Sequence, residues 1–128
     1  MSANATPDDT AIVDGPNTTR ETTRGVLVIT PKGPSIAESD ASSVLAEVLG
    51  DIERANGRVL LDMARVEYMS SAGISMLVQI REACGKAGGS LAISGLASPI
   101  ASVLKTTKVD RLFTLAKTRE KALNKLGD

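Results

Sequence analysis

Two adjacent hydroxyl side chains, Ser70 and Ser71, stand where the sequence predicts that a helix begins. They follow a short apolar run at 59–63 and precede an amphipathic pattern that continues to about residue 86. Serine is a favoured N-cap residue, so one interpretation is a helix start with no further role. The other is that a hydroxyl at a helix N-terminus is a good place to attach and remove a phosphate, because that end of a helix favours negative charge.

The sequence offers these serines no catalytic neighbours. It contains no histidine, which removes the commonest general base and metal ligand. Cys84 is the single cysteine, and we expect it to be a small buried residue. We expect Asp62 to bind nearby backbone in a turn and Glu67 to be solvated, with no substrate site between two carboxylates. The glycine-rich turn at 88–90 lacks the Lys-Ser/Thr pair of a phosphate loop. We therefore predict no enzymatic activity, no catalytic residue, no metal and no cofactor.

Length and composition indicate one small domain with an aliphatic core. The chain has 128 residues, of which 42% are apolar and only two, Tyr68 and Phe113, are aromatic. Its formal net charge of zero gives no field to attract nucleic acid or an anionic membrane, so we expect neither as a partner. No segment resembles a signal peptide or is long enough to span a membrane, which favours a soluble cytoplasmic protein.

Strand and helix patterns alternate along the chain. Residues 25–30, 58–63 and 91–94 have the aliphatic character of buried strands, and 112–115 is a brief last strand. The first helix is expected to begin near Ser39 or Asp40 and the second to cover 72–86, each with one apolar face. In the first helix this face is Ala41, Val44, Leu45, Val48 and Ile52. In the second it is Gly73, Met76, Leu77, Ile80, Cys84 and Ala87, with Ser75, Gln79, Glu82 and Lys86 opposite.

The two ends of the chain carry weaker patterns. Residues 1–10 are expected to form a disordered tail before a single domain at 11–128. A weak edge strand is expected between residues 10 and 23, interrupted by a turn at 15–17. Ser98 is expected to cap a short helix at 99–107, with Pro99 at its first position. Thr118 is expected to cap a last helix that continues to residue 126.

This order of elements predicts an α/β fold. Strands joined through helices form parallel pairs, and right-handed crossovers place the two main helices on one face of the sheet. We expect a mixed, mostly parallel sheet of four to five strands with its helices mainly on one face.

Several short motifs, in their order and spacing, resemble the STAS domain. They are Asp62, Tyr68-Met69, Ser70-Ser71-Ala72-Gly73-Ile74, Gly88-Gly89-Ser90-Leu91 and Gly95-Leu96-Ala97-Ser98-Pro99. More narrowly, they resemble the bacterial anti-sigma factor antagonists, over about residues 25–126. The STAS fold, as this resemblance implies it, is the arrangement described above with a first strand added at an edge.

The resemblance also implies which serine is modified. The antagonists typically read Asp-Ser-Ser/Thr-Gly, and the residue after the Asp takes the phosphate. A gapless count from Asp62 to Gly73 places Ser70 on that Asp and Ser71 on the phosphorylated residue. Near Gly33 the family often carries an acid, and Glu38 is the nearest acid here. The expected partner-binding residues are Ser70, Ser71, Ala72, Gly73, Ile74, Ser75 and Glu38.

The implied function is partner switching without enzymatic activity in this chain. Such an antagonist binds an anti-sigma factor that is also a serine protein kinase, and so releases a sigma factor. The kinase phosphorylates the antagonist and a metal-dependent serine phosphatase resets it. Because Ser70 replaces the family's Asp, a second reading stays open: a non-switching STAS scaffold or accessory subunit of a signalling or lipid-transport complex. Small-ligand binding at the loop before the second helix is a third possibility, supported by less.

Overall fold

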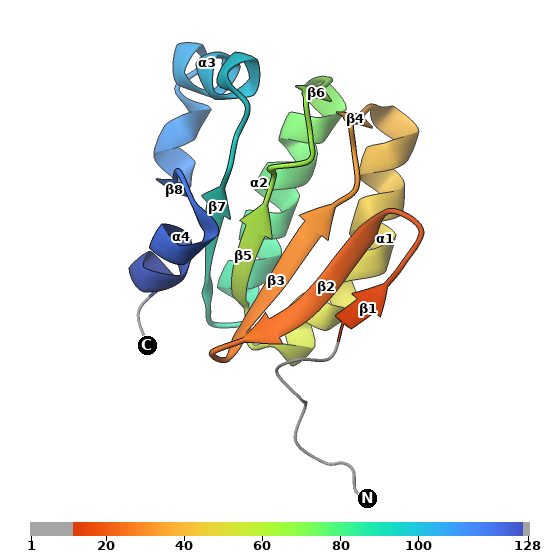
Figure 1. Cartoon of the computed structure of the whole chain (residues 1–128), viewed down its shortest axis with the longest axis vertical. Coiled ribbons are helices and arrows are strands. Elements are labelled where there is room, and N and C mark those ends of the chain that lie inside the picture. Colours follow the sequence, from red (N-terminus) through yellow and green to blue (C-terminus); the bar gives the residue numbers. More distant parts are fainter. Residues whose placement is uncertain (1–11, 127–128) are drawn as a thin grey trace, which may run out of the picture.

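A six-stranded sheet forms the centre of the protein, in the order β1-β2-β3-β5-β7-β8 (Figure 1). The computed structural model describes residues 12–126, so the expected tail at 1–10 lies outside the described residues. Strands β3 (Val26–Pro31), β5 (Arg58–Asp62), β7 (Ser90–Ser94) and β8 (Thr114–Ala116) run parallel. The α/β fold and the mostly parallel sheet are therefore confirmed.

The central strands are buried on both faces, which is why their sequences read as continuous aliphatic runs. Val59, Leu60 and Leu61 of β5 are each 0% exposed. Alternate residues point to opposite faces, so Val59 and Leu61 join the larger core cluster while Leu60 joins the smaller one. The strands expected at 25–30, 58–63 and 91–94 are thus confirmed to within about a residue at each end.

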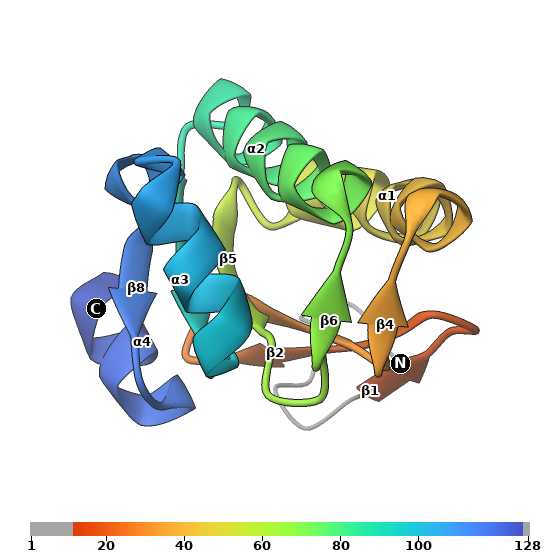
Figure 2. The ribbon, with the colours of Figure 1, turned by 90° about the horizontal axis from the view of Figure 1, so that it is seen from above.

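Helices α1 (Glu38–Arg54) and α2 (Ser71–Lys86) cover one face of the sheet, as expected (Figure 2). The buried residues of both helices are those that the apolar spacing predicted: Ala41, Val44, Val48, Ile52, Gly73, Met76, Leu77, Ile80 and Cys84. Helix α4 (Arg119–Leu126) covers part of the other face, where Ala122 and Leu123 pack against β3, β5 and β7. None of the helices within residues 12–126 is long and apolar enough to cross a membrane.

The sheet has more strands than the four to five that we expected, because the N-terminal edge folds as a hairpin. Strands β1 (Ile12–Asp14) and β2 (Thr18–Thr23) pair antiparallel around the expected turn at 15–17. Strand β2 also pairs antiparallel with β3 over its whole length. A two-stranded parallel sheet of β4 (Ser35–Ile36) and β6 (Tyr68–Met69) was not expected either, since neither segment is long enough to produce a periodic pattern.

Two boundaries near the C-terminus differ from the expectation. Helix α3 (Ser98–Thr106) begins one residue early, because the carbonyl of Ala97 accepts the first helical hydrogen bond from the Ala101 N–H at 2.9 Å. Ala97 and not Ser98 is therefore the N-cap. The last strand begins two residues late, because the segment Val109–Leu112 forms a short 3-10 helix instead. Thr118 does cap α4, through a 3.2 Å hydrogen bond from the Lys121 N–H to its Oγ1.

Glu47 on α1 holds the turn of the β1–β2 hairpin against the helix. Its carboxylate, only 13% exposed, accepts hydrogen bonds from the backbone N–H groups of Asn17 (2.9 Å) and Thr18 (3.1 Å) and from both their side chains. Burial by itself raises the pKa of Glu47, but these hydrogen bonds and the nearby Arg20 guanidinium outweigh it and leave the pKa below its usual value. Arg20 also donates to Asp51 Oδ2 at 2.7 Å, so β2 and α1 are joined by paired charges.

We expect the inward positions of α2 to dominate its contribution to stability. Leu77→Ala or Ile80→Ala should lower the free energy of unfolding by about 2–5 kcal/mol, because each removes a side chain that is 0% exposed. Ser75→Ala and Gln79→Ala, on the exposed side of the same helix, are the matched controls and should change it by no more than about 0.5 kcal/mol. Urea denaturation measures all four, and the reverse ranking would contradict this assignment of the buried face.

Glu47→Gln should destabilise the protein at neutral pH and progressively less in acid. The folded-state pKa of Glu47 is depressed, so its ionised form contributes stability above the ordinary pKa of 4.5, and this contribution is lost as the pH falls through the lower folded value. Urea midpoints of wild type and variant should therefore converge below about pH 4.5. Glu53→Gln, an exposed change on the same helix, should not show this convergence. A pH-independent difference for Glu47→Gln would contradict the assignment.

Candidate functional site

The small β4–β6 sheet places the N-termini of α1 and α2 side by side. Ile36 pairs with Met69, and the Ser70 N–H donates to the Ile36 carbonyl at 3.0 Å. Each helix then begins two residues after the paired position, α1 at Glu38 and α2 at Ser71. Viewed from above, β6 and β4 run next to each other into α2 and α1 (Figure 2). Glu38 and Ser71, far apart in the sequence, thus occupy equivalent positions at one end of the molecule.

The loops that precede these two strands are also tied to each other. The N–H groups of Glu67 and Tyr68 both donate to the Pro34 carbonyl, at 2.7 and 3.2 Å. Gly33 has a φ of +58°, and a Cβ at this position would clash with the backbone oxygen of Arg65. Only glycine allows the two loops to approach this closely. The serine segment therefore follows a well-anchored loop.

Ser70 and Ser71 have different roles at the start of α2. Ser70 is the N-cap, with extended backbone (φ −81°, ψ 178°), and its side chain accepts a hydrogen bond from the Ala72 N–H at 3.2 Å. Ser71 is the first residue of the helix, and its side chain is exposed. One serine thus stabilises the helix end, while the other presents its hydroxyl to solvent.

The remaining residues expected to bind a partner differ in their exposure. Ser75 is exposed, whereas Ala72 and Ile74 are half-buried and pack against the main core cluster. Gly73 is buried, and a Cβ at this position would lie only 3.0 Å from the Cβ of Met69. Gly73 therefore has an indirect role in the expected partner-binding surface, because its lack of a side chain lets α2 approach β6 closely. Tyr68, which sequence reasoning did not single out as a binding residue, is 59% exposed on β6 beside the serines.

The electrostatics of the two helix N-termini are unlike. Helix α1 has Glu38 and Asp40 in its first turn, and the Asp40 carboxylate accepts a hydrogen bond from the Ala37 N–H at 2.9 Å. The first turn of α2 contains no acid. The partial positive charge of the α2 N-terminus therefore has no carboxylate in its own first turn to balance it.

A sequence model of the STAS domain matches residues 17–122. The chain belongs to the STAS domain family. It is 26% identical over 98 residues to a candidate anti-sigma factor antagonist of Bordetella bronchiseptica, BtrV, an alignment that covers 77% of this chain and 84% of BtrV.

Solved structures share the fold of this STAS domain. An anti-sigma factor antagonist from Mycobacterium paratuberculosis superimposes with a TM-score of 0.73 at 22% identity, covering 91% of this chain and all of that one. The Bacillus cell fate determinant SpoIIAA, in its phosphorylated form, superimposes with a TM-score of 0.62 at 16% identity, covering 85% of this chain and 98% of that one.

Asp62 lies at the end of β5, and its hydrogen bonds are made to residues other than the serines. Its Oδ1 accepts a hydrogen bond from the Ala64 N–H at 3.1 Å, which is the turn role expected for it. Its Oδ2 also accepts from Arg119 on α4, at 2.9 Å from Nη2 and 3.1 Å from Nε. Sequence reasoning missed this second role because the partners are 57 positions apart and neither carries a local signal. In this STAS domain the Asp62–Arg119 pair therefore joins α4 to β5 of the sheet.

Cys84 and Glu67 are two further side chains of the STAS domain that could carry chemistry. Burial raises the pKa of the Cys84 thiol to about 11, so this cysteine is a poor nucleophile at neutral pH. Glu67 is exposed, as expected. Within residues 12–126 no cluster of three or more His, Cys, Asp or Glu side chains could hold a metal ion.

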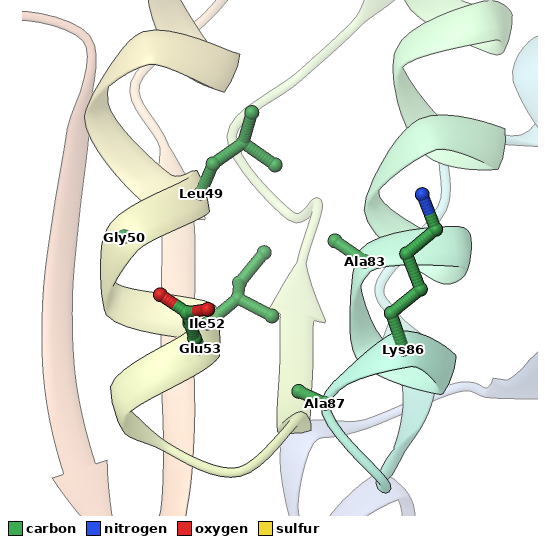
Figure 3. Close-up of a pocket in the computed structure, with 7 residues that line it drawn as sticks. All are labelled: Leu49, Gly50, Ile52, Glu53, Ala83, Lys86 and Ala87. Carbon is green, nitrogen blue, oxygen red and sulfur yellow. The ribbon is translucent and has the colours of Figure 1, made fainter.

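A groove of about 330 Å³ between α1 and α2 lies at the opposite end of these helices from Ser71 (Figure 3). Leu49 and Ala83 contribute apolar surface above the buried Ile52, and Glu53 and Lys86 lie on either side. None of the expected partner-binding residues lines it. We therefore treat the exposed end of α2, with Ser71, as the candidate site.

Ser70 and Ser71 should differ in their effect on stability. Ser70→Ala removes the side-chain cap of α2 and should lower the free energy of unfolding by about 1 kcal/mol. Ser71→Ala is the matched control and should change it by less than about 0.5 kcal/mol, because the side chain is exposed. Urea denaturation of the two variants measures the difference. An equal or larger loss for Ser71→Ala would mean that the capping role is assigned to the wrong serine.

Proposed function

We propose that this protein is an anti-sigma factor antagonist whose binding is controlled by phosphorylation of Ser71. The observation that carries the proposal is the position of Ser71: an exposed hydroxyl at the first residue of a 16-residue helix, beside the N-terminus of α1. The names of the relatives support the same function, since BtrV is a candidate antagonist and SpoIIAA exists in a phosphorylated form.

In its unphosphorylated form the protein binds an anti-sigma factor that is also a serine kinase, and so releases a sigma factor. The binding surface comprises Ser70, Ser71, Ala72, Gly73, Ile74 and Ser75 at the start of α2, with Glu38 at the start of α1. The exposed members, Ser71, Ser75 and Glu38, supply the side chains that meet the partner first. The others position the helix end.

Phosphorylation would change this surface without unfolding the protein. The kinase transfers the terminal phosphoryl group of ATP to Ser71 Oγ, which loses its proton, and a serine phosphatase hydrolyses the phosphate to reset the protein. The phosphate adds about −1.5 to −2 charges and three acceptor oxygens. The first turn of α2 contains no acid, so its N-terminus accommodates the new charge.

The same charge would weaken binding of the partner. A phosphate pressed into an interface that had formed around a neutral hydroxyl must lose its hydration, which is costly unless a cation pairs with it. Phosphorylation therefore releases the partner while the domain stays folded.

We expect Ser71→Ala and Ser71→Asp to behave as opposites. Ser71→Ala should keep the affinity for the anti-sigma factor and resist phosphorylation. Ser71→Asp should fold normally, since an acid near a helix N-terminus stabilises by about 0.3–1 kcal/mol, but should bind the partner at least about tenfold more weakly. Calorimetry with the purified partner measures affinity, and mass spectrometry after incubation with kinase and ATP locates the phosphate.

Ser70→Ala is the matched control for both measurements. It should still be phosphorylated on Ser71, because it loses only the cap of α2. Phosphate on Ser70 alone would overturn the assignment of the site. Phosphate on neither serine, with unchanged partner binding by Ser71→Asp, would favour the alternative of a STAS scaffold or accessory subunit that does not switch.

A further inference from the structure

A second hollow, which we call the β8 cleft, lies at the edge of the sheet formed by β8. Its volume is about 730 Å³, within the range typical of small-molecule sites. Three parts of the chain line it: the turn after β7, the first part of α3, and the segment that runs from β8 through the connection into α4. The lining residues are Gly95, Leu96, Ser98, Ala101, Leu115, Ala116, Lys117, Lys121 and Lys125. None of them belongs to the proposed partner surface.

The floor of the β8 cleft is apolar. Leu96 and Leu115 are half-buried and pack against the main core cluster, while Ala116 packs against the smaller one. The parallel strands β7 and β8 both end at this cleft, the first at Ser94 and the second at Ala116. In open α/β sheets, ligands commonly bind in the crevice beyond the carboxyl ends of the strands. The cleft thus has both the lining and the location of a ligand site.

The rim of the β8 cleft is cationic. Lys117, Lys121 and Lys125 recur every four residues and line one side of it, whereas Ala122 and Leu123 of α4 face the sheet. Lys125 Nζ donates to the Leu115 carbonyl at 2.9 Å, which holds this ammonium at the cleft.

Acidic side chains among the described residues do not neutralise this rim. Lys117 and Lys121 are exposed and form no ion pair within residues 12–126. Glu120, the acid on the same helix, pairs with Arg24 at 3.0 Å instead. Although the formal net charge of the chain is zero, positive charge is therefore concentrated here.

We propose that the β8 cleft binds a small anionic amphiphile: a single molecule with a carboxylate or phosphate group and an apolar chain. The acid group lies among the lysines, and the chain lies over Leu96, Ala101 and Leu115. Lysines also protect exposed edge strands from pairing with other chains. Edge protection needs no hollow apolar floor, however, whereas an amphiphile requires the floor and the charges together. The proposal does not depend on phosphorylation of Ser71.

Isothermal titration calorimetry of the full chain with three eight-carbon probes tests whether the β8 cleft binds an anionic amphiphile. Octanoate and octyl phosphate are titrated below the concentrations at which they form micelles, and uncharged octanol below its solubility limit in water. We expect one molecule of at least one of the two acids to bind per chain, more weakly as salt rises, and octanol to bind at least about tenfold more weakly. The tighter of the two acids identifies the headgroup as carboxylate or phosphate. Failure of both acids to bind, or equal binding of octanol, would overturn the proposal.

Variants locate the site. Lys117→Gln combined with Lys121→Gln should weaken binding of the acid at least about tenfold, because each lost ammonium removes a charge-assisted contact. Ala101→Leu fills the apolar floor and should weaken it similarly while leaving the rim charges in place. Lys86→Gln combined with Lys105→Gln removes the same charge outside the cleft and should leave binding unchanged. An equal loss of acid binding in this control would mean diffuse electrostatic attraction and would overturn the proposal. Association of the protein with anionic vesicles, without binding of either acid, would mean that the cleft contacts a membrane surface and would also overturn it.

Discussion

Burial of the parallel strands on both faces is the constraint on which the rest of this structure depends. Strand β5 has its three central residues fully excluded from solvent, so each face must be covered by other elements. Parallel strands cannot be joined by tight turns, and in this protein each connection between them contains a helix. Right-handed crossovers then place α1 and α2 together on one face. On the other face, α4 covers the smaller cluster around Leu60.

The position of the candidate site follows from this topology. Helices that follow parallel strands begin at the end of the sheet where those strands finish. The short β4–β6 pair then brings the first residues of α1 and α2 to equivalent positions. The two serines have different roles at this end: the Ser70 side chain accepts a hydrogen bond from the Ala72 N–H, and Ser71 remains exposed to solvent. Modifying Ser71 can therefore change a surface without removing a contact on which the fold depends.

Hydrogen bonds and ion pairs of polar side chains join the outer elements to the apolar core of the domain. Glu47 binds the hairpin turn through Asn17 and Thr18, and Asp62 binds α4 through Arg119. Each carboxylate is largely excluded from water and has several donors around it, as a buried charge requires. Both contacts join segments that are distant in the sequence. They stabilise the edges of the domain, while the aliphatic core stabilises its middle.

The sequence by itself determined the parts of this protein whose signals are local and periodic. The aliphatic runs of β3, β5 and β7, the buried faces of α1 and α2, the cap at Thr118 and the helix start at the two serines could all be predicted. In each case the pattern arises within a few residues. The family resemblance, carried by motifs in order, was also readable from the sequence.

Only the tertiary structure decided which distant residues meet. No sequence pattern near Glu47 or Asp62 indicates which residues they bind, because a single long-range contact produces no repeating pattern in the sequence. Strands β4 and β6 have two residues each and exist only because the loops around Pro34 and Glu67 pack together. The lysines after β8 are ordinary surface residues in the sequence, and they line one side of a cleft only because α4 folds back against the edge of the sheet. Local patterns specify elements, whereas long-range packing specifies the surfaces between them.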